Sequence, residues 1–331
     1  MTTSIEAPTS AAIARAVAHL RDGQLVAFPT ETVYGLGADA SNPEAVHRIF
    51  AAKGRPVDHP VIVHLHDASQ LVHWASDVPE AARVLASAFW PGPLTLIVPR
   101  AAQVADIVTG GQHCVGLRVP SHPVARALLA AFGNGIAAPS ANRFGRISPT
   151  TARHVADDLG EMVPMIIDGG ACTIGIESTI VAFAGEEPVL LRPGAIGVPE
   201  LTRVLGRAPR GPDTDTPRAS GTLASHYAPR TAASLVAPAI LCAEIAQLDA
   251  RDESVAVLGR TIAKPDDFAG TWFSAPLDAG AYAHDLYAAL RQLDAAKADV
   301  ILIETVPDDD AWLAVRDRLL RATHGEDDDR D

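Results

Sequence analysis

The chain has 331 residues, 48% of them hydrophobic and 20% charged, which exceeds what one hydrophobic core usually serves and predicts two domains of a globular protein. It has no run of about 18 uncharged apolar residues and no signal-peptide pattern, so we expect a cytoplasmic protein without a membrane span. The net charge of −13 divides into −2 over residues 1–232 (20 acidic, 18 basic) and −11 over residues 233–331 (20 acidic, 9 basic), which argues against a broad polyanion-binding surface on the second part.

Helical and strand patterns mix along the first two hundred residues. A helix over 10–20 and a buried strand over 25–28 precede a Gly-rich turn around Gly35 and Gly37, and Asn42 and Pro43 begin a helix through about residue 52. Further helices are expected at 79–89, 123–132 and 151–158, and further strands at 61–65, 94–98, 115–119, 165–168, 179–183 and 189–192. The lack of strict alternation favours an α/β or α+β domain over a simple doubly wound fold.

The second half begins with a linker. Residues 206–232 lack apolar periodicity and are rich in proline and glycine, yet the segment from Ser225 to Pro229 (SHYAP) is unusually specific for a spacer. Strands at 255–258 and 300–304 and helices at 281–293 and 311–320 then predict a small parallel sheet. We expect a first domain over 1–205, the linker over 206–232, an α/β domain over 233–325 and a solvated acidic tail over 326–331.

The sequence does not predict a metal or dinucleotide site. Cys114, Cys172 and Cys242 are widely spaced, so we expect small buried residues rather than disulfides or thiolate ligands. His64 and His66 would point to opposite faces of a strand, one inward and one outward. The segment 35–40 formally matches a dinucleotide fingerprint but does not join a strand directly to a helix.

Several cationic and hydroxyl-rich segments suit an anionic ligand. Arg55 is suited to bind two phosphate oxygens with its planar guanidinium, and Lys53 to add a mobile point charge. Taken alone, the pair is better explained as cations that complement the dipole at the C-terminus of the preceding helix. Arg118 closes a buried strand and is expected at the rim of a cleft. The loop from 137 to 150 offers small residues and hydroxyl donors; read more simply, it is a turn followed by a helix cap at Ser148 or Thr150.

Taken in order, these motifs resemble one family, the YrdC-like L-threonylcarbamoyladenylate synthases. The resemblance covers about residues 10–205, and the SHYAP linker with a small α/β domain is similar to the long, two-domain form. The segments that carry it are PTETVYGLG (29–37), KGRP (53–56) followed by His64, WPGPLTLI (90–97), LRVP (117–120), APSAN (138–142 with Ala137) with SPT (148–150), ESTI (177–180) and LRPGAI (191–196).

The resemblance implies a twisted, mixed-sheet domain with a large cleft and a smaller Rossmann-like domain without a cofactor. It implies an enzyme that joins L-threonine, bicarbonate and ATP, with Mg²⁺ on the phosphates and no redox cofactor, into threonylcarbamoyl-AMP and pyrophosphate. The product would serve tRNA modification through a downstream threonylcarbamoyl-transfer machinery, with no stable nucleic-acid binding by this chain. Two alternatives stay open: an RNA-binding module, or a related carbamoyl- or adenylate-transfer enzyme.

The resemblance also implies site residues, with no metal ligand among them. His59 and Cys114 stand where the family often has Asn and Thr. Lys53 and Arg55 are expected to dominate catalysis, because gathering anions is the harder part of the reaction. Tyr227 is expected to reach the nucleotide as the linker folds over the cleft. The residues expected around threonine, here called the threonine set, are Thr32, His64, Arg118, Ala138 and Ser178; the ATP set is Lys53, Arg55, His59, Cys114, Ser140, Ser148, Arg192 and Tyr227.

Overall fold

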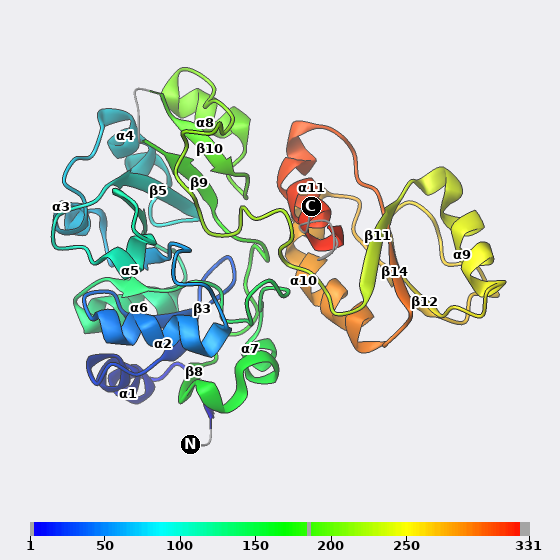
Figure 1. Cartoon of the computed structure of the whole chain (residues 1–331), viewed down its shortest axis with the longest axis horizontal. Helices are drawn as coiled ribbons and strands as arrows, with labels where there is room; N and C mark the ends of the chain where they lie inside the picture. Colours follow the sequence, from blue (N-terminus) through cyan, green and yellow to red (C-terminus); the bar gives the residue numbers. More distant parts are fainter. Residues whose placement is uncertain (1–2, 184–186, 325–331) are drawn as a thin grey trace. The chain divides into compact units, whose positions relative to one another are not determined.

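A computed structural model describes residues 3–183 and 187–324, and it divides into two compact units (Figure 1). The first unit comprises the described residues of 1–144 and 148–222. The second comprises 145–147 and the described residues from 223 onward. The division at Thr222 and Leu223 therefore lies inside the segment that we predicted as a linker, and the predicted acidic tail lies outside the described residues.

The first unit is built on a mixed sheet, as the predicted fold class requires. Its described strands follow the order β1-β8-β2-β3-β7-β4-β6-β5-β9-β10, with parallel pairs such as β4–β6 and antiparallel pairs such as β2–β3. The strands are β1 (Ser4–Glu6), β2 (Val26–Pro29), β3 (Tyr34–Asp39), β4 (Ile62–His64), β5 (Leu94–Pro99), β6 (Cys114–Arg118), β7 (Ile136–Ala137), β8 (Met165–Ile167), β9 (Thr179–Ala182) and β10 (Val189–Arg192).

Helices cover both faces of this sheet. Neighbouring residues of a strand point to opposite faces, so one strand packs against helices on both sides. Val26 and Phe28 pack with α1 and α6, whereas Ala27 belongs to the core cluster under α2 and α4. None of the described helices is both long and apolar enough to cross a lipid bilayer. The helices are α1 (Ser10–Arg21), α2 (Pro43–Lys53), α3 (Leu71–Trp74), α4 (Glu80–Phe89), α5 (Asp106–Thr109), α6 (Pro123–Phe132), α7 (Ala152–Leu159) and α8 (Val198–Leu205).

One local prediction is wrong: Gly35 and Gly37 lie in β3, not in a turn. They face Phe28 and Val26 on the antiparallel strand β2. A Cβ atom on Gly37 would lie 2.8 Å from the Phe28 ring and 2.9 Å from Ile136. These glycines therefore serve close packing between strands rather than chain reversal. A second correction is small: Thr151, not Ser148 or Thr150, caps α7.

The second unit contains a four-stranded parallel sheet, which confirms the predicted small parallel sheet. Its described strands follow the order β11-β14-β12-β13. In Figure 1, α9 lies on one side of these strands, and α10 and α11 lie on the other. The edge strands and α9 were not predicted. The elements are β11 (Ala232–Val236), α9 (Leu241–Asp249), β12 (Val255–Gly259), β13 (Thr271–Ser274), α10 (Ala279–Ala295), β14 (Val300–Glu304) and α11 (Leu313–Thr323).

Candidate active site

Arg118 lies at the end of β6 and joins three elements of the first unit. Its guanidinium forms an ion pair with Glu31 at 2.7 Å, and the two side chains are 4% and 5% exposed. Nη1 donates to Thr32 Oγ1 at 2.9 Å, and Nε donates to the carbonyl of Gly92 at 3.3 Å. Arg118 is thus buried at the centre of the candidate site rather than at the rim that we expected.

Glu31 is a site residue that the sequence did not single out, although it stands inside the PTETVYGLG segment. Burial raises the pKa of its carboxyl, but the nearby charge and donors of Arg118 lower it by more, so the net pKa lies below its usual value. Glu31 is therefore an anion at neutral pH. It supplies the counter-charge that a buried guanidinium needs.

His64 lies beside Arg118 in the sheet, as its register partner on β4. Burial and the charge of Arg118 lower the pKa of His64 to about 3, so the imidazole is neutral. Its Nδ1 has no hydrogen-bond partner among the described residues. His64 is buried and His66 is partly exposed, which confirms the prediction of one inward and one outward histidine.

The neutral His64 predicts acid sensitivity of the first unit. Its pKa is about 6.5 in an unfolded chain and about 3 in the folded one, so between these values the unfolded chain binds the extra proton. Stability should fall as pH decreases through this window, by up to about 1.4 kcal/mol per pH unit from this group. Urea unfolding between pH 7 and 4 checks this: His64→Gln should show a shallower slope, and an unchanged slope would contradict the assignment.

Lys53 does not act as the mobile charge that we predicted. It is the last residue of α2, it is buried, and its Nζ donates to the carbonyls of Ser140 and Asn142 at 2.5 Å each. Burial and the charge of Arg55 hold its pKa well below the usual value. Lys53 therefore fixes the loop that carries Ser140.

Arg55 and His59 flank the ring of Phe144. The guanidinium carbon lies 5.5 Å from the ring centre, and the His59 ring meets it edge-on at 5.3 Å. Nη2 of Arg55 donates to the carbonyl of Pro60 at 2.8 Å and to Ser220 Oγ at 3.4 Å. These contacts hold a buried guanidinium in a defined orientation.

Arg192 connects the two predicted sets. Its Nε donates to the carbonyl of Ser178 at 3.0 Å and its Nη2 to the hydroxyl of Ser178 at 3.1 Å. Nη1 donates to the carbonyl of Ser220 at 2.7 Å. Ser178 also shares a hydrogen bond of 2.8 Å with Thr95. A member of the threonine set and a member of the ATP set are therefore in direct contact.

Ser148 of the ATP set and Ala138 of the threonine set lie near the residues just described. Ser148 donates to Glu177, the residue before Ser178, at 2.5 Å. Ala138 is buried after β7, and its N–H donates to the carbonyl of Ile62 on β4 at 2.9 Å, two residues before His64. The threonine set thus gathers around the central strands β4, β6 and β7 and the start of β9.

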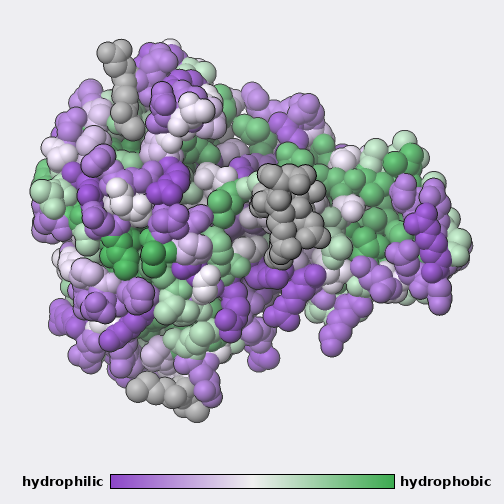
Figure 2. Space-filling view, in the orientation of Figure 1, coloured by the Kyte–Doolittle hydropathy of each residue, from purple (hydrophilic) through white to green (hydrophobic). Residues whose placement is uncertain are grey.

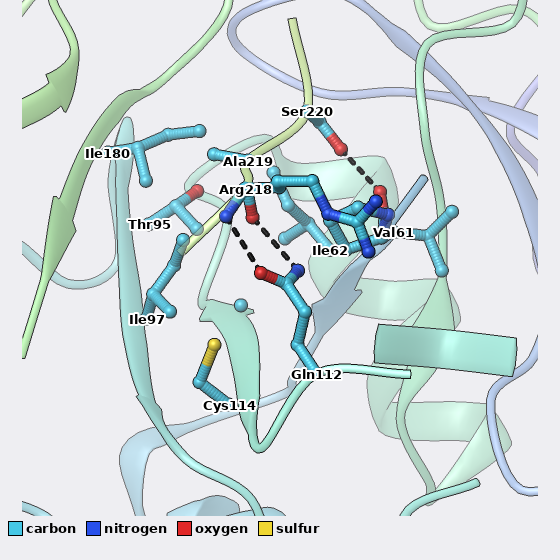
Figure 3. A pocket seen from close by; sticks show the side chains of 12 residues that line it. Val61, Ile62, Thr95, Ile97, Gln112, Cys114, Ile180, Arg218, Ala219 and Ser220 are labelled. Atoms are coloured by element: carbon cyan, nitrogen blue, oxygen red, sulfur yellow. Dashed lines mark hydrogen bonds between the residues drawn. The ribbon is translucent and has the colours of Figure 1, made fainter. Parts of the chain in front are cut away.

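Linker residues fill a pocket beside these groups (Figure 3). The backbone of Arg218 exchanges two hydrogen bonds with the Gln112 side chain, at 3.1 and 2.7 Å, and Ser220 Oγ donates to the carbonyl of Pro60 at 2.7 Å. The free volume left is about 10 Å³, which is room for about one water molecule. Cys114 lines this pocket, and burial raises the pKa of its thiol to about 11.

Of the residues predicted for the site, Tyr227 alone belongs to the second unit. Its side chain is 1% exposed. The ring lies 5.6 Å from that of Tyr287, and the guanidinium carbon of Arg318 lies 5.3 Å from its centre. Tyr227 is therefore a core residue of the second unit. Within the first unit, residues 218–220 of the predicted linker contact Arg55 and Arg192, and the sequence did not single them out.

No group of three or more His, Cys, Asp or Glu side chains in the described ranges is placed to hold a metal ion. All three cysteines are free. The prediction that they are buried is confirmed for Cys172 and wrong for Cys242, which is exposed on α9, while Cys114 is half-buried.

Comparisons with known proteins cover both units. Residues 18–194 match the family model Sua5_yciO_yrdC, described as "Telomere recombination", and residues 196–324 match the model of the threonylcarbamoyl-AMP synthase C-terminal domain. Threonylcarbamoyl-AMP synthase of Pyrococcus abyssi is 41% identical over 93% of this chain and 93% of its own. That of Bacillus subtilis is 41% identical over 95% and 93%.

A solved structure is similar over the same extent. The crystal structure of P. abyssi Sua5 complexed with L-threonine has a TM-score of 0.89 to this chain at 39% identity, and the match covers 97% of each chain.

Proposed function

Because the chain belongs to the Sua5/YciO/YrdC family in its long, two-domain form, we propose that it is a threonylcarbamoyl-AMP synthase. It joins L-threonine, bicarbonate and ATP into threonylcarbamoyl-AMP and pyrophosphate, and the product serves tRNA modification in the cytoplasm. One observation carries the proposal: similarity to the threonine-bound P. abyssi protein runs through 97% of both chains.

In this proposal the threonine set binds the amino acid. Arg118 takes the substrate carboxylate, because a guanidinium fixed by Thr32 and Gly92 keeps a planar fork for two oxygens. His64 is neutral, so it exchanges a hydrogen bond with threonine without repelling the ammonium group. Ser178 adds a hydroxyl from the start of β9.

The chemistry places modest demands on a general base. The threonine amine attacks bicarbonate to give a carbamate and water, or attacks the CO₂ in equilibrium with bicarbonate to give a carbamate and a proton. A carbamate oxygen then attacks the α-phosphorus of ATP, and pyrophosphate leaves. Deprotonating an α-amino group with a pKa of about 8 costs about 1 to 1.5 kcal/mol at pH 7, and the amine of a free amino acid costs somewhat more. The larger demand is to hold two anions together, which Arg55, Arg192 and the Mg²⁺ carried by ATP meet. Lys53 positions the Ser140 loop for this step.

The linker acts as a lid on the nucleotide. Ser220 contacts both Arg55 and Arg192, so it leaves these guanidinium groups when phosphate oxygens bind them. Its return shields a labile adenylate from water. Tyr227 supports this movement from within the second unit, as the residue that anchors the far end of the linker.

We expect Arg218→Ala to loosen this lid. The Arg218 side chain donates to the carbonyl of Gly110 at 3.0 Å and pairs with Asp58 at 3.3 Å. Without these contacts, the apparent KM for ATP should fall two- to fivefold, and threonylcarbamoyl-AMP should be hydrolysed sooner after its formation. Quenched-flow analysis of the intermediate measures both.

Ser220→Ala completes the lid test, because it removes the hydroxyl that contacts Arg55 and Pro60. Tyr227→Ala is less informative, because truncating a buried aromatic ring costs about 3 to 5 kcal/mol of stability. Unchanged turnover and intermediate lifetime in Arg218→Ala and in Ser220→Ala would reject the lid.

Pyrophosphate release from ATP, measured with and without L-threonine and bicarbonate, tests the proposed reaction. Release should require both, and Arg55→Ala should reduce it strongly. Pyrophosphate release that does not depend on threonine would leave the fold assignment intact and indicate another carbamoyl- or adenylate-transfer reaction. Binding of RNA that weakens steeply with salt, without such turnover, would favour the nucleic-acid-binding alternative.

A further inference from the structure

The second unit contains a groove on its α9 face, separate from every residue discussed above for catalysis. Its volume is about 680 Å³, and it lies between α9, the turn that follows α9, and the loop that precedes β13. Its apolar floor includes Ile245, Val255 and Phe268. Four carboxylates line it as well: Asp249, Asp252, Glu253 and Asp267.

The groove exists because α9 covers its side of the sheet incompletely. Leu241 is the one fully buried residue among those of α9, whereas Cys242 and Ala246 are exposed. Ile245 and Phe268 are half-buried against the core cluster that contains Val255. The floor is therefore an accessible extension of the hydrophobic core. On the face shown in Figure 2, hydrophobic residues of the second unit lie beside hydrophilic ones.

The charged residues around the groove indicate which kind of ligand it can bind. The turn after α9 and the loop before β13 hold three cations (Arg251, Arg260 and Lys264) and four acidic residues, and Asp249 ends α9 beside them. Four of these carboxylates and none of the cations line the groove, and residues 233–331 as a whole carry −11. A nucleic acid or an acidic peptide would be repelled. The ring of Phe268 already accepts a cation, since Lys264 Nζ lies 5.8 Å from its centre. Lys264 shows that a cation is compatible with this ring, and an arginine or lysine of a ligand would pair with the carboxylates that line the groove beside it.

We propose that this groove docks a basic peptide segment of a partner protein. One apolar side chain of the segment fills the floor, and flanking Lys or Arg side chains pair with Asp249, Asp252 and Asp267. The volume is within the range of about 300 to 1,000 Å³ that is usual for ligand pockets, which suits one or two side chains rather than a whole helix. The proposal is independent of the reaction assigned to the first unit.

Fluorescence anisotropy of the full-length chain tests the proposal. The probe is a labelled nine-residue peptide with a central Leu-Phe and two basic residues on each side; a control peptide replaces Leu-Phe by Ser-Ser. The groove variant is Asp249→Asn/Asp252→Asn/Asp267→Asn. Asp252 has a φ of 60°, which asparagine tolerates. The matched variant, Asp285→Asn/Asp308→Asn/Asp310→Asn, removes the same charge elsewhere on this unit. Ala246→Phe fills the groove without changing its charge.

The groove variant and Ala246→Phe should each weaken probe binding at least tenfold, and the matched variant less than twofold. The Ser-Ser peptide should bind at least tenfold more weakly than the probe. Equal weakening by the two triple variants, or equal binding of the two peptides, would reduce the site to general charge attraction and overturn the proposal. Self-association that the groove variant abolishes would make a second copy the occupant and also overturn it. If the triple variant does not fold, Ala246→Phe decides.

Discussion

Glu31→Gln should lower the free energy of unfolding of this protein by about 3 to 5 kcal/mol, the usual cost of leaving one charge of a buried pair uncompensated. Arg118 and Glu31 are 4% and 5% exposed and 2.7 Å apart, so water cannot replace the lost carboxylate. The remaining partners of Arg118, the hydroxyl of Thr32 and the carbonyl of Gly92, carry no net charge. Urea unfolding at pH 7 measures the loss.

Asp157→Asn is the matched control, because it breaks an exposed ion pair. Arg153 and Asp157 are 80% and 51% exposed and 2.9 Å apart on α7, and such pairs contribute about 0.3 to 0.5 kcal/mol. L-threonine should stabilise Glu31→Gln more than the wild type, because its carboxylate can act as the missing counter-charge. A loss for Glu31→Gln no larger than that for Asp157→Asn would show that Arg118 does not depend on Glu31.

Arg55→Ala should reduce kcat/KM for pyrophosphate release by about 100- to 1,000-fold, the usual effect of removing one preorganised donor to a developing charge. The guanidinium is buried and held by Pro60 and by the ring of Phe144. Arg55→Lys should recover little of the activity, because an ammonium cannot form two parallel hydrogen bonds to phosphate oxygens.

Two measurements separate a catalytic role of Arg55 from a structural one. Arg153→Ala, at the exposed position on α7, should leave turnover within twofold of the wild type. Guanidinium ion added to Arg55→Ala should restore part of the turnover, which a purely structural defect would not allow. Turnover of Arg55→Ala within threefold of the wild type would remove Arg55 from the site.

The sequence predicts a helix or strand correctly where the buried residues of that element recur at regular spacing. The helix expected over 123–132 has these bounds in α6, which Pro123 starts and Gly133 ends in the left-handed conformation. Strand β3 was missed, because its glycines indicate a turn in a single sequence. Glycine is needed there because side chains on other strands, Phe28 and Ile136, approach the backbone closely.

The sequence by itself determined the two-domain α/β class, the parallel sheet of the second unit and, through ordered motifs, the family. These properties depend on periodicity and on short segments, which a linear pattern records. The tertiary structure alone decided that Glu31 neutralises Arg118, that Lys53 binds the Ser140 loop rather than moving freely, and that Ser220 occupies the place beside Arg55 and Arg192. Each is a contact between residues 28 or more positions apart in the chain, and the charge and burial that govern it arise from folding.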